Sequence, residues 1–135
     1  MGARTSGREA ALQMMFAHDI ARHSTDQLIA RYWREVPGDV EGREFADELV
    51  RGTIGERDHL DELISAASKN WRIERMARVD RNILRLGAYE LKRSGAPKEV
   101  VLDEAVELAK RYGAEGSSVF VNGVLDRIAD DLDAR

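Results

Sequence analysis

The spacing of apolar residues between widely separated helix-breaking positions is the feature that most limits how this chain folds. The chain has two prolines, Pro37 and Pro97, and between its glycines and prolines the apolar residues recur with helical spacing. This period is typical of α-helices, whereas the side chains of a half-buried strand alternate at every second position. The sequence therefore predicts an all-α fold of about seven helices without a sheet.

Two capping signals predict where the first helices begin. Ser6 and Glu9 have the spacing of a capping box, in which each side chain bonds a free backbone N–H of the first turn, and they predict a helix over residues 6–22. Ser24 and Gln27 repeat this spacing and predict a short second helix that the following Pro-Gly pair ends.

A long third helix is predicted over residues 41–68, with Gly52 and Gly55 in its middle. Each glycine costs a helix about 0.8–1 kcal/mol relative to alanine, so we expect this pair to allow a bend or a close helix crossing. Residues 71–76 are predicted to follow as one short helical turn.

Single residues mark the helix starts in the second half of the chain. Asp80 is predicted to be the N-cap of the next long helix. An extended stretch over residues 100–102 is expected before Asp103 caps another helix, and Pro97 as the first helical residue is the alternative start. The last helix is predicted to begin near Ser117, with one apolar stripe that consists of Val121, Val124, Leu125, Ile128 and Leu132.

The composition excludes several classes of protein. At 135 residues the chain suffices for one domain, which we expect to span residues 1–135. Because it contains no cysteine, it has no disulfide, thiolate nucleophile or cysteine zinc site. The N-terminus lacks a signal-peptide core and no stretch approaches the ~20 apolar residues that span a bilayer, so we expect a cytoplasmic protein. A net charge of −4 argues against strong non-specific binding of a nucleic-acid duplex.

No residues have the spacing of a catalytic or metal site. His18 and His23 do not share a helix face, and His59 lies among charged residues that are typical of a solvated helix surface. The sequence also lacks nucleotide-binding glycine loops, serine-hydrolase elbows and zinc-protease motifs. We therefore expect a protein that is not an enzyme and that uses no catalytic residue, metal or cofactor.

The predicted first helix is apolar around nearly its whole circumference. Such a helix either lies at the centre of the core or has a second side that a partner covers. If a partner covers it, Met14 and Phe16 are the side chains that we expect the partner to contact.

Two predicted helix starts carry groups that could bind RNA. The first lies beside two guanidiniums and two hydroxyls, those of Arg4, Thr5, Ser6 and Arg8. The second carries small residues and an aromatic ring, those of Gly116, Ser117, Ser118 and Phe120. The positive end of a helix stabilises a phosphate. The ring, at the flank of the core stripe, either stacks on a base, which is worth about 1–3 kcal/mol, or packs under the neighbouring helix.

The predicted helix after Asp80 separates its charges by face. Arg81, Arg85 and Lys92 share one face, which we interpret as solvated. Asp80 falls on the apolar side, where it either caps the helix or faces a basic partner, and the two roles are compatible.

Four segments along nearly the whole chain carry a family resemblance. They are Arg8-Glu9-x-Ala11-x-Gln13 with Phe16, Ile83-Leu84-Arg85 through Tyr89-Glu90-Leu91, residues 103–110 (DEAVELAK), and residues 113–126, which contain GAE and FVNGVLD. In this order they resemble the NusB family of transcription antitermination factors.

The resemblance implies two small helical bundles packed across each other and no catalysis. It implies binding of the single-stranded boxA element of ribosomal RNA leaders together with the ribosomal protein NusE. This binding would act in the RNA polymerase antitermination complex, promoting read-through and rRNA maturation. A basic partner would supply the cations that this acidic chain lacks.

Carried over by position, the resemblance assigns RNA binding to the two helix starts, namely Arg4, Thr5, Ser6, Arg8, Gly116, Ser117 and Phe120. It assigns partner binding to Phe16, Glu74 and Asp80. Thr5 and Ser6 stand where the family is often basic, which implies weaker RNA affinity of the isolated chain. Phe16 stands where Tyr is frequent and lacks a hydroxyl for the partner.

Two alternatives to this function remain. A related helical domain is fused to RNA cytosine methyltransferases, but this chain has neither a βαβ pattern nor a catalytic cysteine for methyl transfer. The other alternative is a helical protein-protein scaffold without its own RNA affinity. A homodimer through an uncovered apolar surface is compatible with either function.

Overall fold

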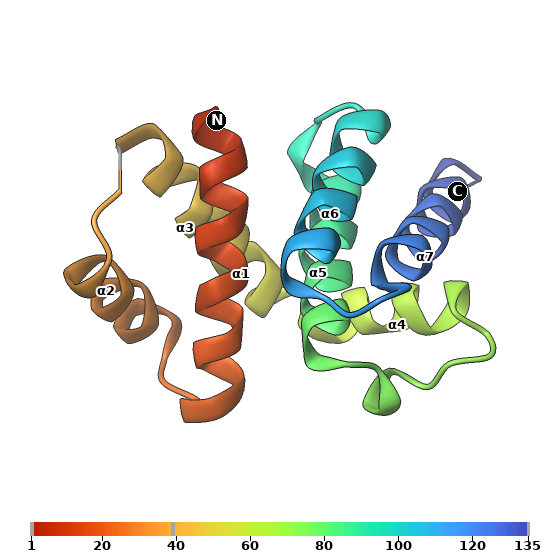
Figure 1. The fold of residues 1–135 in the computed structure, drawn as a ribbon, viewed down its shortest axis with the longest axis horizontal. Coiled ribbons are helices and arrows are strands. Elements are labelled where there is room, and N and C mark those ends of the chain that lie inside the picture. The colour runs from red at the N-terminus through yellow and green to blue at the C-terminus, as the bar shows by residue number, and fades with distance from the viewer. Residues whose placement is uncertain (1, 39, 135) are drawn as a thin grey trace. The chain divides into compact units, whose positions relative to one another are not determined.

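The computed structural model describes residues 2–38 and 40–134, and within these ranges every regular element is a helix (Figure 1). The all-α prediction is confirmed, with seven α-helices and two short helical segments in the described ranges. None of these helices is long and apolar enough to cross a membrane. The chain divides into two compact units, residues 1–55 and residues 56–135.

The first unit consists of α1 (Ala3–Ala21), α2 (Thr25–Glu35) and α3 (Val40–Gly55). α1 packs on both other helices, mainly on α3. Gly7 allows their close approach, because a Cβ there would lie 2.7 Å from the backbone oxygen of Gly42 and 3.0 Å from the Phe45 ring. The crossing of α1 and α3 therefore depends on the absence of a side chain at this position.

One of the two predicted capping boxes forms. The Ser24 hydroxyl accepts a hydrogen bond from the Gln27 amide, and the Gln27 side-chain oxygen accepts one from the Ser24 amide, both at 3.2 Å, which confirms the start of α2. The predicted start at Ser6 is wrong. α1 begins at Ala3, and the Ser6 amide donates to the Gly2 carbonyl at 3.1 Å. The three residues before Ser6 include neither Gly nor Pro, so the helix continues by one more turn.

The long helix predicted over residues 41–68 is two helices. Glu56, at φ −110° and ψ 16°, interrupts the helical path directly after Gly55. The change of direction that we expected from the glycines occurs at this point, but it ends one helix and begins another.

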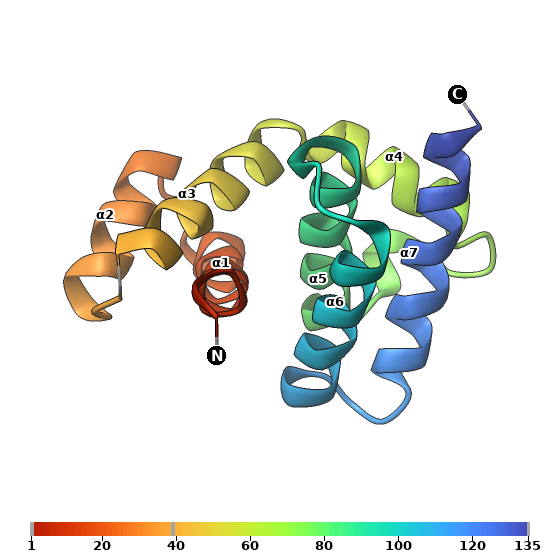
Figure 2. The same ribbon diagram turned by 90° about the horizontal axis from the view of Figure 1, so that it is seen from above.

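The second unit contains α4 (Arg57–Ala67), η1 (Ile73–Arg75), α5 (Arg78–Tyr89), the π-helical segment η2 (Glu90–Ser94), α6 (Lys98–Tyr112) and α7 (Ser117–Asp133). α5 contacts α4, α6 and α7, and α7 lies alongside α5 and α6 (Figure 2). Side chains less than 2% exposed in this unit include Leu60, Ile64, Ile83, Leu84, Leu125 and Ile128. The start of α7 at Ser117 and its buried stripe are confirmed, although Leu132 is half-buried.

Two other predicted boundaries in the second unit are wrong. Asp80 is not an N-cap, because α5 already begins at Arg78, with Ala77 in the cap position. Residues 100–102 are helical rather than extended, because α6 starts directly after Pro97. The fixed φ of this proline suits the entry into a helix, which makes the alternative start the closer prediction.

Candidate nucleic-acid interface

The first group of predicted RNA-binding residues lies on α1, in the first unit: Arg4, Thr5, Ser6 and Arg8. Arg4 is exposed, and its Cζ lies 4.8 Å from the centroid of the Phe45 ring. Arg8 is 4% exposed, and its Cζ lies 5.1 Å from the same centroid. Both guanidiniums therefore pack on one ring, where Arg8 helps to hold α1 on α3 and Arg4 remains accessible to an anion.

Ser6 also lines a hollow of about 200 Å³ in the first unit. Tyr32 lies in the same lining, and its hydroxyl donates to the Gln13 side-chain oxygen at 2.6 Å. Arg43, a third lining residue, has its Cζ 5.1 Å from the Trp33 ring. The structure thus adds a phenol and a cation from α2 and α3 to the predicted hydroxyl of Ser6.

The second group, Gly116, Ser117 and Phe120, forms the start of α7 in the second unit. Gly116 has a φ of +87°, a left-handed conformation that glycine adopts without strain. Ser117 is 4% exposed, and its hydroxyl accepts a hydrogen bond from the Ala114 amide at 3.0 Å. These two residues shape the turn that places Phe120, while the next amides, of Ser118 and Val119, belong to the first helical turn and have no intrahelical acceptor.

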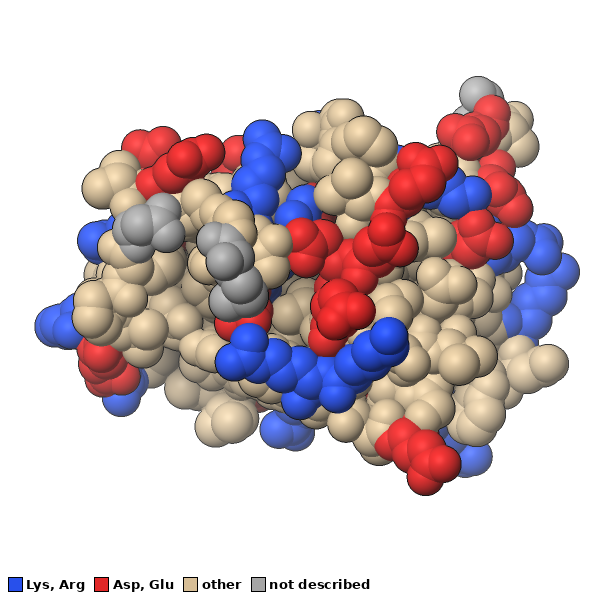
Figure 3. Space-filling view, turned by 45° about the horizontal axis from the view of Figure 1, so that its top comes forward, with Lys and Arg blue, Asp and Glu red and all other residues tan. Residues whose placement is uncertain are grey.

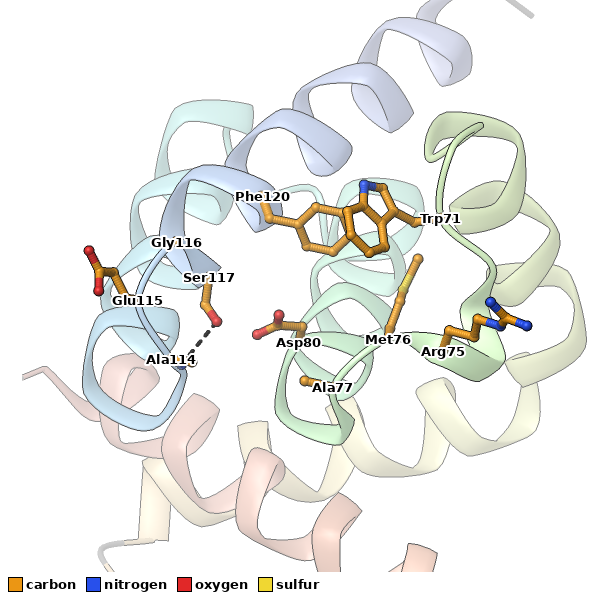
Figure 4. A pocket seen from close by; sticks show the side chains of 10 residues that line it. All are labelled: Trp71, Arg75, Met76, Ala77, Asp80, Ala114, Glu115, Gly116, Ser117 and Phe120. Carbon is orange, nitrogen blue, oxygen red and sulfur yellow. Dashed lines mark hydrogen bonds between the residues drawn. The ribbon is translucent and has the colours of Figure 1, made fainter.

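Phe120 borders a pocket of about 300 Å³ that lies entirely within the second unit (Figure 4). The lining residues come from the segment around η1, from α5 and from the start of α7; they include Trp71, Arg75, Met76, Asp80, Glu115 and Phe120. The Trp71 and Phe120 rings meet edge to face, with centroids 6.0 Å apart and planes at 74°. Trp71 is 59% exposed, so the pocket has an accessible aromatic wall.

Asp80 carries an unsatisfied acceptor in this pocket. Its Oδ1 atom is buried, and no described residue donates a hydrogen bond to it. Figure 4 shows its carboxylate turned toward the Ser117 side of the pocket. The structure therefore places Asp80, predicted for the protein partner, together with Phe120, predicted for RNA.

The other two predicted partner residues lie apart from this pocket lining. Phe16 is half-buried on α1, in the first unit, and Glu74 is exposed in η1, in the second. Most of the apolar circumference of α1 is buried, as expected of a core helix, whereas Ile20 is 74% exposed.

The basic face predicted on α5 is not a solvated surface. Arg85 is 8% exposed and makes a bidentate pair with Asp61, at 2.8 and 3.0 Å. Lys92 contacts the carboxylate of Glu56 and lies 2.7 Å from Nδ1 of His59. These cations are engaged by other helices and do not offer a free surface to phosphate.

Other charges near this point follow the same pattern. Hydrogen bonds from Lys92 and then Arg93 lower the pKa of Glu56 below its usual value. On the face seen in Figure 3, basic side chains form short groups that acidic and uncharged side chains interrupt. No three His, Asp or Glu side chains in the described ranges are grouped so that they could hold a metal ion.

Trp71, Arg75 and Met76 are pocket residues that the sequence did not indicate. Their segment was predicted correctly as a short helical turn, which the structure shows as η1, but without a role. A tryptophan in a connecting segment was the available signal, because connections between helices often carry function.

Comparisons with known proteins agree on one family. The NusB family model matches residues 5–130. Transcription antitermination protein NusB of Sorangium cellulosum is 62% identical over 133 residues, which cover 98% of this chain and 95% of that protein. The structure of T. maritima NusB matches with a TM-score of 0.87 at 40% identity, covering 95% of this chain and 91% of that one. A crystal structure of the antitermination factors NusB and NusE in complex with dsRNA matches with a TM-score of 0.86 at 28% identity, covering 97% and 98%. The chain therefore belongs to the NusB family.

Proposed function

We propose that this chain is a non-enzymatic transcription antitermination factor of the cytoplasm. It binds single-stranded boxA RNA of ribosomal RNA leaders together with the ribosomal protein NusE, and it promotes read-through by RNA polymerase and rRNA maturation. The relative crystallised with NusE and dsRNA supports both partners. The single observation in this chain that carries the proposal is the open aromatic pocket at the start of α7, formed by Phe120 and Trp71.

The charge of the chain explains why a partner would be needed. Single-stranded RNA is held by base stacking on aromatic rings and by cations along its backbone. The second unit offers the rings, but its cations Arg85 and Lys92 are paired internally. A basic partner would therefore provide much of the attraction to phosphate.

We assign RNA contacts to the two groups on α1 and α7, which are Arg4, Thr5, Ser6, Arg8, Gly116, Ser117 and Phe120. Among them, exposed Arg4 and the Phe120 ring are the direct contacts, whereas buried Arg8 and Ser117 hold the local structure. Phe16 and Glu74 are the proposed contacts to NusE. The position of Asp80 in the Phe120 pocket makes it available to either partner.

Titration of labelled single-stranded boxA RNA, with and without NusE, tests the proposal. We expect weak binding by the chain alone and tighter, sequence-dependent binding with NusE, and a scrambled RNA of equal composition serves as the control. Phe120→Ala should weaken RNA binding about 5- to 100-fold, since one stacked base is worth about 1–3 kcal/mol.

The same titration decides against the alternative of a protein-protein scaffold. If NusE binds RNA equally well with and without this chain, the adaptor function is wrong and the scaffold is right. Sedimentation over a range of concentrations in the absence of NusE tests whether the chain forms a homodimer.

A further inference from the structure

The interior of the Phe120 pocket lacks a hydrogen-bond donor. Trp71, Met76 and Phe120 give it apolar walls, and Asp80 contributes a carboxylate whose buried Oδ1 has no partner in the described part of the chain. A buried charged oxygen without a donor is costly, so a ligand that brings N–H groups to this position gains more than it would elsewhere on the surface.

The rim of the pocket has the opposite character. Arg75 lines it, and the first turn of α7 directs backbone N–H groups toward its edge beside Gly116. A lysine or arginine side chain of a protein would satisfy Asp80 but would be repelled by these positive groups. A nucleotide suits both regions, because its base carries donors and its phosphate is negative.

We propose that this pocket binds a guanine of single-stranded RNA, with the base against Trp71 and Phe120 and the Asp80 carboxylate accepting its N1–H and N2 amino hydrogens. Guanine presents two adjacent donors on its Watson–Crick edge, which match the two oxygens of a carboxylate. Uracil places its single N–H between two carbonyl oxygens, and adenine and cytosine place a ring acceptor beside their amino group, so a carboxylate repels part of each edge.

This inference rests on the proposed RNA-binding function and adds base selectivity to it. Stacking on Phe120 alone is sequence-tolerant, because every base has a π-face. Asp80 is therefore the residue that determines specificity, while the two rings supply affinity.

The test compares two RNA hexamers, one of uridine only and one with a single central guanosine, titrated calorimetrically into the full chain with and without NusE. Wild type should bind the guanosine hexamer about tenfold more tightly, within the 5- to 100-fold range of bidentate base contacts. Asp80→Asn keeps the size of the side chain but replaces one acceptor by a donor, so the ratio should fall to about one. An unchanged melting temperature checks that this variant folds.

Glu115→Gln is the matched control, because it removes the same charge from an exposed residue of the same pocket lining. It should raise the affinity for both hexamers equally and leave their ratio unchanged. The two indole N–H resonances provide a second readout. That of Trp71 should shift on addition of the guanosine hexamer, whereas that of Trp33, bonded to Asp47 at 2.6 Å, should not.

Three results would overturn the inference. Equal binding of both hexamers by wild type, still dependent on Phe120, would remove the guanine selectivity but keep the proposed function. An unchanged ratio in Asp80→Asn together with weaker NusE binding would assign the carboxylate to the protein interface. No binding of either hexamer or of boxA RNA, with or without NusE, would refute the proposed function itself.

Discussion

Replacing Gly7 with alanine would test whether the close approach of α1 and α3 determines the stability of the first unit. The added Cβ would lie 2.7 Å from the Gly42 backbone oxygen and 3.0 Å from the Phe45 ring. Because a backbone oxygen cannot rotate away, the two helices must move apart. Overpacking of this kind costs about 1–3 kcal/mol, and the higher helix preference of alanine offsets about 1 kcal/mol. We expect a net loss of up to about 2 kcal/mol in the free energy of unfolding.

Gly123→Ala is the matched control, since a Cβ at this exposed position of α7 would meet no heavy atom within 4 Å. There the helix preference acts alone, and we expect stabilisation by about 0.5–1 kcal/mol. Urea denaturation of the two variants and of wild type measures both changes. Equal effects of the two substitutions would refute the reasoning, because they would show that contact with α3 does not matter at Gly7.

Three further predictions concern the second unit. Arg85→Ala should lower the free energy of unfolding by about 2–4 kcal/mol in thermal or urea denaturation, because it leaves the Asp61 carboxylate partly buried without its partner. Lys92 and its neighbour lower the pKa of Glu56 from 4.5, so this pairing stabilises the fold above pH 4.5 and progressively less below it. Glu56→Gln should reduce the acid sensitivity seen in denaturation at a series of pH values. Gly116→Ala should cost about 1–2 kcal/mol, because alanine is strained at a φ of +87°, and should weaken RNA binding by displacing the adjoining aromatic ring.

Each of these predictions has a result that would contradict it. Arg127→Ala breaks an exposed ion pair with Asp131 and should cost less than about 0.5 kcal/mol, so a similar loss in Arg85→Ala would show that burial has no effect. An identical pH profile for Glu56→Gln would remove this carboxylate from the acid response. Gly116→Ala with wild-type stability and RNA affinity would show that the turn accepts an ordinary residue.

Local signals predicted the helices well where nothing competed with them. Ser24 and Gln27 form their capping box, and the small residues before Ser117 mark a real helix start. The same box at Ser6 did not form, because its amide has a backbone acceptor in an earlier turn of the helix. Capping residues therefore indicate possible starts, and the residues before them decide whether the helix extends further.

The candidate site was only partly predictable because it depends on contacts between distant segments. The start of α7 was found from its own sequence, including Phe120 at the flank of the stripe. Neither the contact of Phe120 with Trp71 nor the unsatisfied oxygen of Asp80 can be read from spacing, since both require the placement of η1 and α5. Arg85 was taken as solvated for the same reason, because its partner Asp61 lies on another helix.

The two tryptophans of the chain lie in different units and in different surroundings. Trp33 is 9% exposed and gives its indole N–H to Asp47, whereas Trp71 is 59% exposed. Their intrinsic fluorescence should therefore separate by wavelength, with Trp33 emitting toward the blue and shifting to the red when the first unit opens. With Trp71 replaced by phenylalanine, the remaining emission would follow the unfolding of the first unit without any attached dye.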